Sequence, residues 1–118
     1  MSVVIKRAYE QPTGDDGYRV LVDRLWPRGL ARDDIRLDEW LKDVAPSDQL
    51  RRSFHRDETT WGEFRNRYLS ELKGHRGELR RLVEISRQGR LTLIFSAKDP
   101  ERNNALVLKQ YLRMLGAG

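Results

Sequence analysis

Residues 23–29, DRLWPRG, gather charged side chains at the point where an apolar run stops. They include the carboxylate of Asp23, the guanidinium groups of Arg24 and Arg28, and the indole of Trp26. Because arginine presents a planar fork that matches phosphate and carboxylate groups, the chemistry that suits this cluster is the binding of a small anion. Asp23 is then a candidate for proton transfer. A polar turn, in which Asp23 pairs with the arginines and Trp26 packs on the sheet edge, is an equally open interpretation.

A second polar stretch, SAKDPERNN at residues 96–104, follows the apolar run LTLIF at 91–95. It adds Lys98, Asp99 and Asn104 as candidate ligand-binding residues. If the apolar runs before the two stretches are parallel strands, their ends share one edge, where open α/β sheets bind ligands. Asp99, followed by a proline, also predicts the N-cap of a final helix, whose free amides and dipole favour an anion.

His55 is the other candidate acid or base, because the ordinary pKa of histidine lies near neutrality. An exposed histidine at a helix end is the alternative. The chain has two histidines and no cysteine, which excludes disulfides and thiolate nucleophiles. The acids show no ligand-like spacing, so we expect no metal site. No Walker A loop or G-x-G-x-x-G fingerprint occurs, and we expect no cofactor.

Hydrophobic patterning predicts three strands. Residues 2–9 are rich in β-branched residues, and residues 18–26 contain an apolar run from Val20 to Val22. The continuous apolar run at 91–95 is typical of a strand buried on both faces. The connection at residues 10–17 is short for a parallel crossover, which usually needs a dozen residues or more. A hairpin between the first two strands therefore stays open.

Helical periodicity accounts for much of the rest. A first helix is predicted from an apolar stripe at i, i+3, i+4 and i+7, formed by Leu37, Trp40, Leu41 and Val44. Ser47 can cap the next helix, and Thr60 with Glu63 forms a capping box for a third, which the glycines of KGHRG at 73–77 interrupt. We expect one α/β domain at 1–118, with a short, mostly parallel three-stranded sheet and helices packed on it.

Charge and composition bear on partners and location. The chain has 23 Lys and Arg against 18 Asp and Glu, a net charge of +5. A basic chain is typical of nucleic-acid binding, so the alternative function is a nucleic-acid-binding or regulatory module that uses Arg51, Arg52, Arg80 and Arg81. A partner-binding subunit is a third possibility. No stretch approaches the roughly 20 apolar residues of a membrane span, and we expect a cytoplasmic protein with no membrane partner.

Four blocks of the sequence resemble the YeaO-like proteins, a bacterial and archaeal family within a larger group classed as a domain of unknown function. The blocks are DDGYRVLVDRLWPRGL, WLKDVAPSDQLRRSFHRD, WGEFRNRYLSEL and LTLIFSAKDPERNNALVLKQYL. The resemblance covers nearly the whole chain and implies a small cytoplasmic α/β protein with a short parallel sheet, which favours the parallel arrangement over the hairpin. The family motif falls on Asp23, Arg24, Trp26, Pro27, Arg28, Gly29, His55, Asp57, Lys98, Asp99 and Asn104.

The resemblance assigns no function. Relatives in the broader group carry cysteines near the strand ends, and thiol chemistry is not carried over to a chain without cysteine. From the residues, we expect Arg24, Arg28 and Lys98 to hold a small anionic ligand, with Asp23 and His55 as proton-transfer groups if there is a reaction. We further expect Trp26 to line an open cleft rather than to be fully buried.

Overall fold

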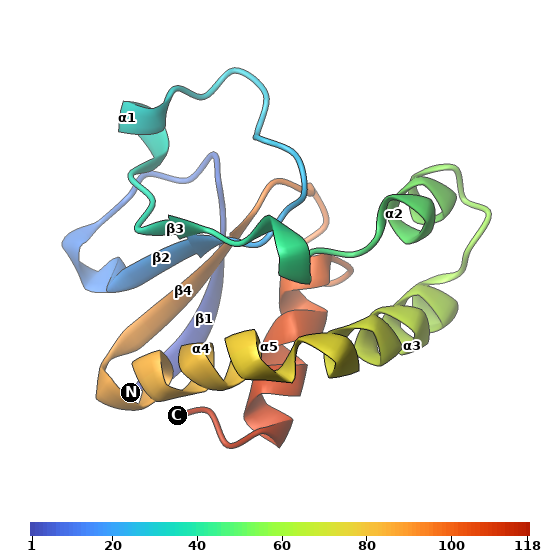
Figure 1. The fold of residues 1–118 in the computed structure, drawn as a ribbon. Coiled ribbons are helices and arrows are strands. Elements are labelled where there is room, and N and C mark those ends of the chain that lie inside the picture. Colours follow the sequence, from blue (N-terminus) through green and yellow to red (C-terminus); the bar gives the residue numbers. More distant parts are fainter.

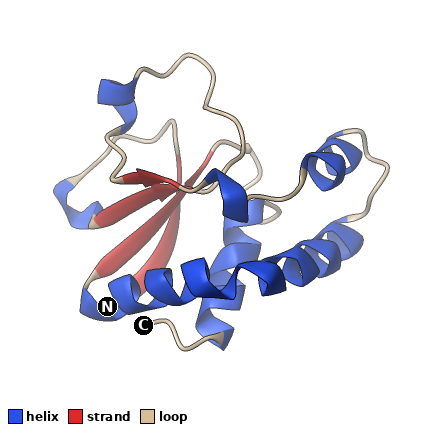
Figure 2. Cartoon of the chain, in the orientation of Figure 1, coloured by secondary structure: helices blue, strands red, loops and turns tan.

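Four parallel strands form one sheet in the computed structural model, which describes all 118 residues (Figures 1 and 2). The strands are β1 (Ser2–Arg7), β2 (Tyr18–Leu21), β3 (Glu39–Trp40) and β4 (Arg90–Phe95). Their order across the sheet is β1-β4-β2-β3, and each neighbouring pair is parallel. The apolar run of β4 occupies the interior of the sheet, as expected of a strand covered on both faces.

Five α-helices and three short 3-10 turns connect and cover the strands. The helices are α1 (Arg32–Ile35), α2 (Asp48–His55), α3 (Trp61–Leu72), α4 (Arg76–Gln88) and α5 (Asn104–Met114). Figure 1 shows α3 and α4 following one another as a bent rod, because the interrupting glycines produce only the 3-10 turn Lys73–His75. The same view shows α2 standing away from the sheet. No helix has the length and hydropathy that crossing a membrane requires.

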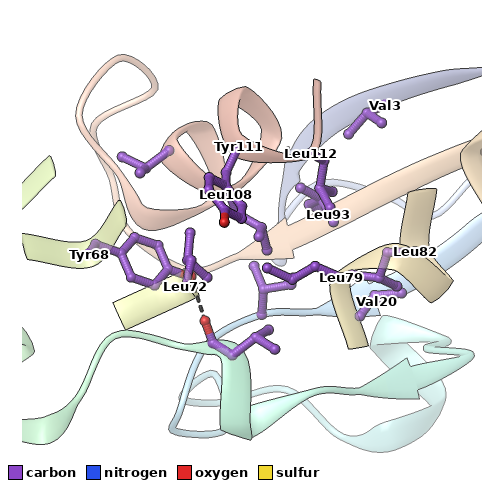
Figure 3. Close-up of a cluster of buried hydrophobic side chains, with 14 of the residues drawn as sticks. Val3, Val20, Tyr68, Leu72, Leu79, Leu82, Leu93, Leu108, Tyr111 and Leu112 are labelled. Carbon is purple, nitrogen blue, oxygen red and sulfur yellow. Dashed lines mark hydrogen bonds between the residues drawn. The ribbon is translucent and has the colours of Figure 1, made fainter. Parts of the chain in front are cut away.

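The main core lies between the sheet and the layer formed by α3, α4 and α5. Strand residues such as Val20 and Leu93 face Leu82 of α4 and Leu108 of α5, all fully buried (Figure 3). Tyr68 of α3 is also fully buried, and its hydroxyl donates to a backbone carbonyl at 2.6 Å. Burying a large apolar side chain contributes roughly 1.5–3 kcal/mol, so this layer supplies most of the stability.

The opposite face of the sheet is covered by α1 and by loops rather than by long helices. A smaller cluster of Ala8, Leu21, Ile35 and Ile94 is buried there. Trp26 and Trp40 pack against it and meet edge to face, with ring centroids 5.4 Å apart. The fold is therefore a helix layer, a sheet and a thin second cover, and the loops of that cover include the DRLWPRG stretch.

The prediction of three strands is wrong, because residues expected in a helix form the fourth. Trp40 pairs with Leu21 and Glu39 pairs with Val20 at the free edge of β2. The indole N–H of Trp40 also donates to the carbonyl of Asp23 at 2.7 Å. The apolar residues at 37–44 do have helical spacing, but pairing with the free edge of β2 determines the structure of Glu39 and Trp40.

The hairpin between the first two strands is also excluded, since β4 lies between β1 and β2. The short connection between β1 and β2 is held by the buried carboxylate of Asp16. It accepts hydrogen bonds from Lys6 at 3.1 Å and from Arg19 at 2.5 Å. Gly17 then enters β2 with φ of 66°, a left-handed conformation that favours glycine. A Cβ at this position would overlap the backbone carbonyl of Arg90.

The last helix begins later than predicted. Its N-cap is Asn103, whose side chain accepts from the amide of Leu106 at 2.8 Å, and not Asp99. Asp99 instead accepts from the amides of Glu101 and Arg102, which forms a turn before the helix. Because Asn103 also donates to the Asp99 carbonyl at 2.9 Å, the turn and the cap stabilise each other. The second strand is shorter than predicted as well, since it ends at Leu21.

Candidate functional site

The C-terminal ends of β2 and β4 open on a pocket of about 450 Å³, named here the edge pocket. Its walls come from the DRLWPRG stretch, from the residues after β4, from the start of α5 and from α2. The residues predicted from the sequence that line it are Asp23, Arg24, Trp26, Arg28, His55, Lys98 and Asn104. Asp99 is not among the lining residues. The parallel arrangement thus brings together side chains that are up to 81 positions apart in the chain.

Asp23 links the three segments that form the floor of the edge pocket. One carboxylate oxygen accepts from the amide and the hydroxyl of Ser96, at 2.9 and 2.7 Å. The other oxygen accepts from the side-chain amide of Asn104 at 2.9 Å, and Asn104 also donates to the carbonyl of Val22. Hydrogen bonds to a charged acceptor are the stronger ones, so this network fixes the end of β2, the end of β4 and the start of α5 relative to one another. Both oxygens of Asp23 are therefore engaged.

The guanidinium of Arg24 is largely occupied by contacts within the protein. Its guanidinium donates to the carbonyls of Pro46 at 3.2 Å and Ala45 at 3.4 Å, and lies 3.8 Å from the carboxylate of Asp48. It thereby holds the segment that leads into α2 against the end of β2. This engagement leaves Arg24 less available to an anion than the sequence suggested.

Three cations of the edge pocket have side chains that make neither a hydrogen bond nor an ion pair within the chain. They are Arg28, Lys98 and Arg102, and all three are exposed. We call them the free cations. Asp23 is the only acidic side chain of the lining, and its oxygens are engaged. The local charge is therefore strongly positive.

Helix α2 contributes Arg51, Phe54 and His55 to the edge pocket, at i, i+3 and i+4 of one helix face. The guanidinium of Arg51 lies 3.4 Å from Asp48, while its Nε is buried without a hydrogen-bond partner. An unpaired buried donor costs roughly 1–3 kcal/mol. The imidazole of His55 is exposed at the pocket rim, with no partner in the chain.

Trp26 is half-buried, and its indole N–H donates to the carbonyl of Leu30 at 2.7 Å. It lines the edge pocket and also a wider hollow of about 690 Å³ on the β3 side. That hollow contains two arginines and three acids, so its charges nearly balance; they are Arg32, Arg36, Asp33, Asp38 and Glu39. The edge pocket is therefore the better candidate for recognising a charged ligand.

Two of the four arginines that suggested nucleic-acid binding have different surroundings. Arg51 lies in the edge pocket, whereas Arg81 of α4 donates to Glu39 at 3.0 and 2.5 Å and to Glu78 at 3.0 Å. These hydrogen bonds, chiefly those to Glu39, raise the pKa of Arg81 further above its usual range. Glu39 in turn accepts from the hydroxyl of Tyr18 at 3.0 Å. Arg81 thus joins α4 to β3 rather than remaining free for phosphates.

Sequence reasoning missed part of the pocket wall. Arg102, Tyr9 and Phe54 were not predicted as site residues, and all three line the pocket. The signal for Arg102 was its place within the stretch after β4, three residues beyond Asp99. The contribution of α2 depends on its packing against α3, where Phe54 stacks on Phe64 with ring centroids 4.5 Å apart.

Comparison with known proteins identifies the family. A family model described as "Inactive DUF488-N3 subclade" matches residues 2–115. The chain belongs to this subclade. Among its relatives is the uncharacterized protein YeaO of Escherichia coli K12, 47% identical over 115 residues that cover 98% of this chain and 100% of the relative. The predicted resemblance to YeaO-like proteins is thus confirmed.

Mycobacteria also have relatives of this chain. The uncharacterized protein Rv3073c of Mycobacterium tuberculosis H37Rv is 40% identical over 110 residues, which cover 93% of this chain and 92% of the relative. The uncharacterized protein Mb3100c of Mycobacterium bovis matches to the same extent. No solved structure matches the chain.

Proposed function

We propose that the edge pocket binds a small ligand that carries a phosphate or carboxylate group, held by the free cations Arg28, Lys98 and Arg102. The observation that carries this proposal is the excess of positive charge around one pocket whose single carboxylate, Asp23, has both oxygens engaged. Exposed cations without partners are the groups that gain most from an anion, because no existing ion pair has to be broken.

The position of the pocket supports the same proposal. It lies beyond the carboxyl ends of two parallel strands, beside the start of α5, where open α/β sheets bind ligands and helix termini favour anions. The volume of about 450 Å³ falls in the range of small-molecule sites, roughly 300–1,000 Å³. A metabolite of modest size, rather than a macromolecule, fits such a space.

The proposed function is binding, with no reaction assigned. A general base needs an acceptor site within reach of the proton that it removes, and the oxygens of Asp23 already use three of their roughly four such sites in hydrogen bonds. His55 is free at the rim, but no second side chain of the lining orients its imidazole. The subclade is described as inactive, which supports assigning no reaction to the pocket.

Isothermal titration calorimetry with inorganic phosphate and with citrate, at low ionic strength, tests the proposal. We expect saturable binding that Arg28→Ala and Lys98→Ala each weaken at least tenfold. Arg67→Ala is the matched control, because Arg67 is an exposed and unpaired arginine of α3 outside the pocket. Binding that is equally weakened in all three variants, or no binding of either anion, would contradict the proposed function.

A further inference from the structure

Aromatic rings line the edge pocket beside its cations. Tyr9, Trp26, Phe54 and Phe64 all contribute to the lining. A site for a bare anion such as phosphate needs donors and charge, and apolar rings add nothing to its affinity. The presence of rings and free cations in one pocket therefore requires its own explanation.

Two of these rings are held in place by contacts within the protein. The indole of Trp26 donates to the carbonyl of Leu30 at 2.7 Å and meets the ring of Trp40 edge to face. Phe54 stacks on Phe64 with ring centroids 4.5 Å apart and an interplanar angle of 28°. Rings that are held in place before a ligand arrives lose little conformational entropy on binding.

Neither Trp26 nor Phe54 is fully buried, so each keeps some surface for contact. Tyr9 is 45% exposed, and its hydroxyl donates to the backbone carbonyl of Arg28 at 3.0 Å. This bond ties the Tyr9 ring to the backbone of Arg28, while the guanidinium carbon of Arg7 lies over the ring at 5.0 Å from its centroid.

We infer that the ligand is a nucleoside monophosphate, whose base contacts the rings and whose phosphate contacts the free cations; this inference rests on the proposed function of the same pocket. Three cations match the nearly doubly negative charge of a phosphate monoester. Stacking of a base on an aromatic side chain contributes roughly 1–3 kcal/mol, whichever base is present. A sugar phosphate without a base would gain only the charge contacts.

The test compares AMP, GMP, CMP and UMP with ribose 5-phosphate and with inorganic phosphate, by titration calorimetry on the full chain. At least one nucleotide should bind ten times more tightly than ribose 5-phosphate. Phe54→Leu, which keeps apolar bulk but removes a ring, should weaken the nucleotide at least fivefold and leave ribose 5-phosphate unchanged. Trp26→Leu should do the same and serves as the second variant.

Trp61→Leu is the matched control. Trp61 belongs to the same aromatic cluster as Phe54, with ring centroids 5.9 Å apart, but it does not line the pocket. It should therefore leave nucleotide affinity unchanged while causing a similar loss of packing. If nucleotides, ribose 5-phosphate and phosphate bind equally and depend on Arg28, the anion site stands and the nucleotide inference is overturned. If none of them binds, both the proposed function and this inference fail.

Discussion

Replacing Asp23 by asparagine should destabilise the protein although the two side chains have the same shape. The carboxylate accepts two hydrogen bonds from Ser96 and one from Asn104. An asparagine has one acceptor oxygen, so its NH₂ group must face either the donors of Ser96 or the amide of Asn104. At least one donor then loses its partner and meets another donor. A hydrogen bond to a charged group contributes roughly 1.5–3 kcal/mol, and we expect Asp23→Asn to cost about 3 kcal/mol.

Urea denaturation followed by circular dichroism measures this cost, and thermal unfolding should show a fall of about 10 °C. Asp33→Asn is the control, because Asp33 is exposed and its carboxylate makes no hydrogen bond. In a Ser96→Ala background the Asp23→Asn change should cost less, because the two residues share their hydrogen bonds. A loss below about 0.5 kcal/mol in the single variant would refute the view that Asp23 fixes the pocket floor.

Other parts of the fold give further tests. Burial raises the pKa of Asp16, but hydrogen bonds from the backbone and two cations outweigh it and lower that pKa from 3.8 to about 2. The folded pKa is the lower one, so up to about 2.5 kcal/mol of stability is present above pH 5 and is lost as the pH falls toward 2; Asp16→Asn should remove this dependence in urea titrations at pH 7 and pH 3. Gly17→Ala should cost about 2–4 kcal/mol in thermal unfolding, because of its positive φ and the overlap with the Arg90 carbonyl; an unchanged midpoint would contradict the geometry. Arg51→Met keeps the apolar stem and removes the unpaired Nε, so stability should rise by about 1 kcal/mol, whereas a loss would mean that the contact with Asp48 outweighs the orphan donor.

The position of the edge pocket was predictable from the sequence because its main parts follow apolar runs. Once the runs that contain Leu21 and Leu93 are parallel strands, the residues after each must meet at one sheet edge. The pairing of Arg24 with carbonyls was not predictable, since Ala45 and Pro46 reach it only through the path of the chain after β3.

Two errors in the predicted fold have local causes. Asp99 and Asn103 are both good N-caps four residues apart, and only the packing of α5 on the sheet decides between them. Strand β3 has two residues, too few for a period-2 pattern to appear, and its pairing depends on a free edge next to Leu21. Such short edge strands are set by tertiary contacts rather than by propensity.

The central place of β4 has a consequence for the growing polypeptide on the ribosome. Strand β1 pairs only with β4. Strand β2 pairs with β4 on one side and, over two residues only, with β3 on the other. Until residues 90–95 have left the exit tunnel, β1 therefore has no partner strand. Its β-branched residues can then pair with other chains. We expect nascent chains released before residue 90 to aggregate, and the sheet to form only once synthesis is nearly complete.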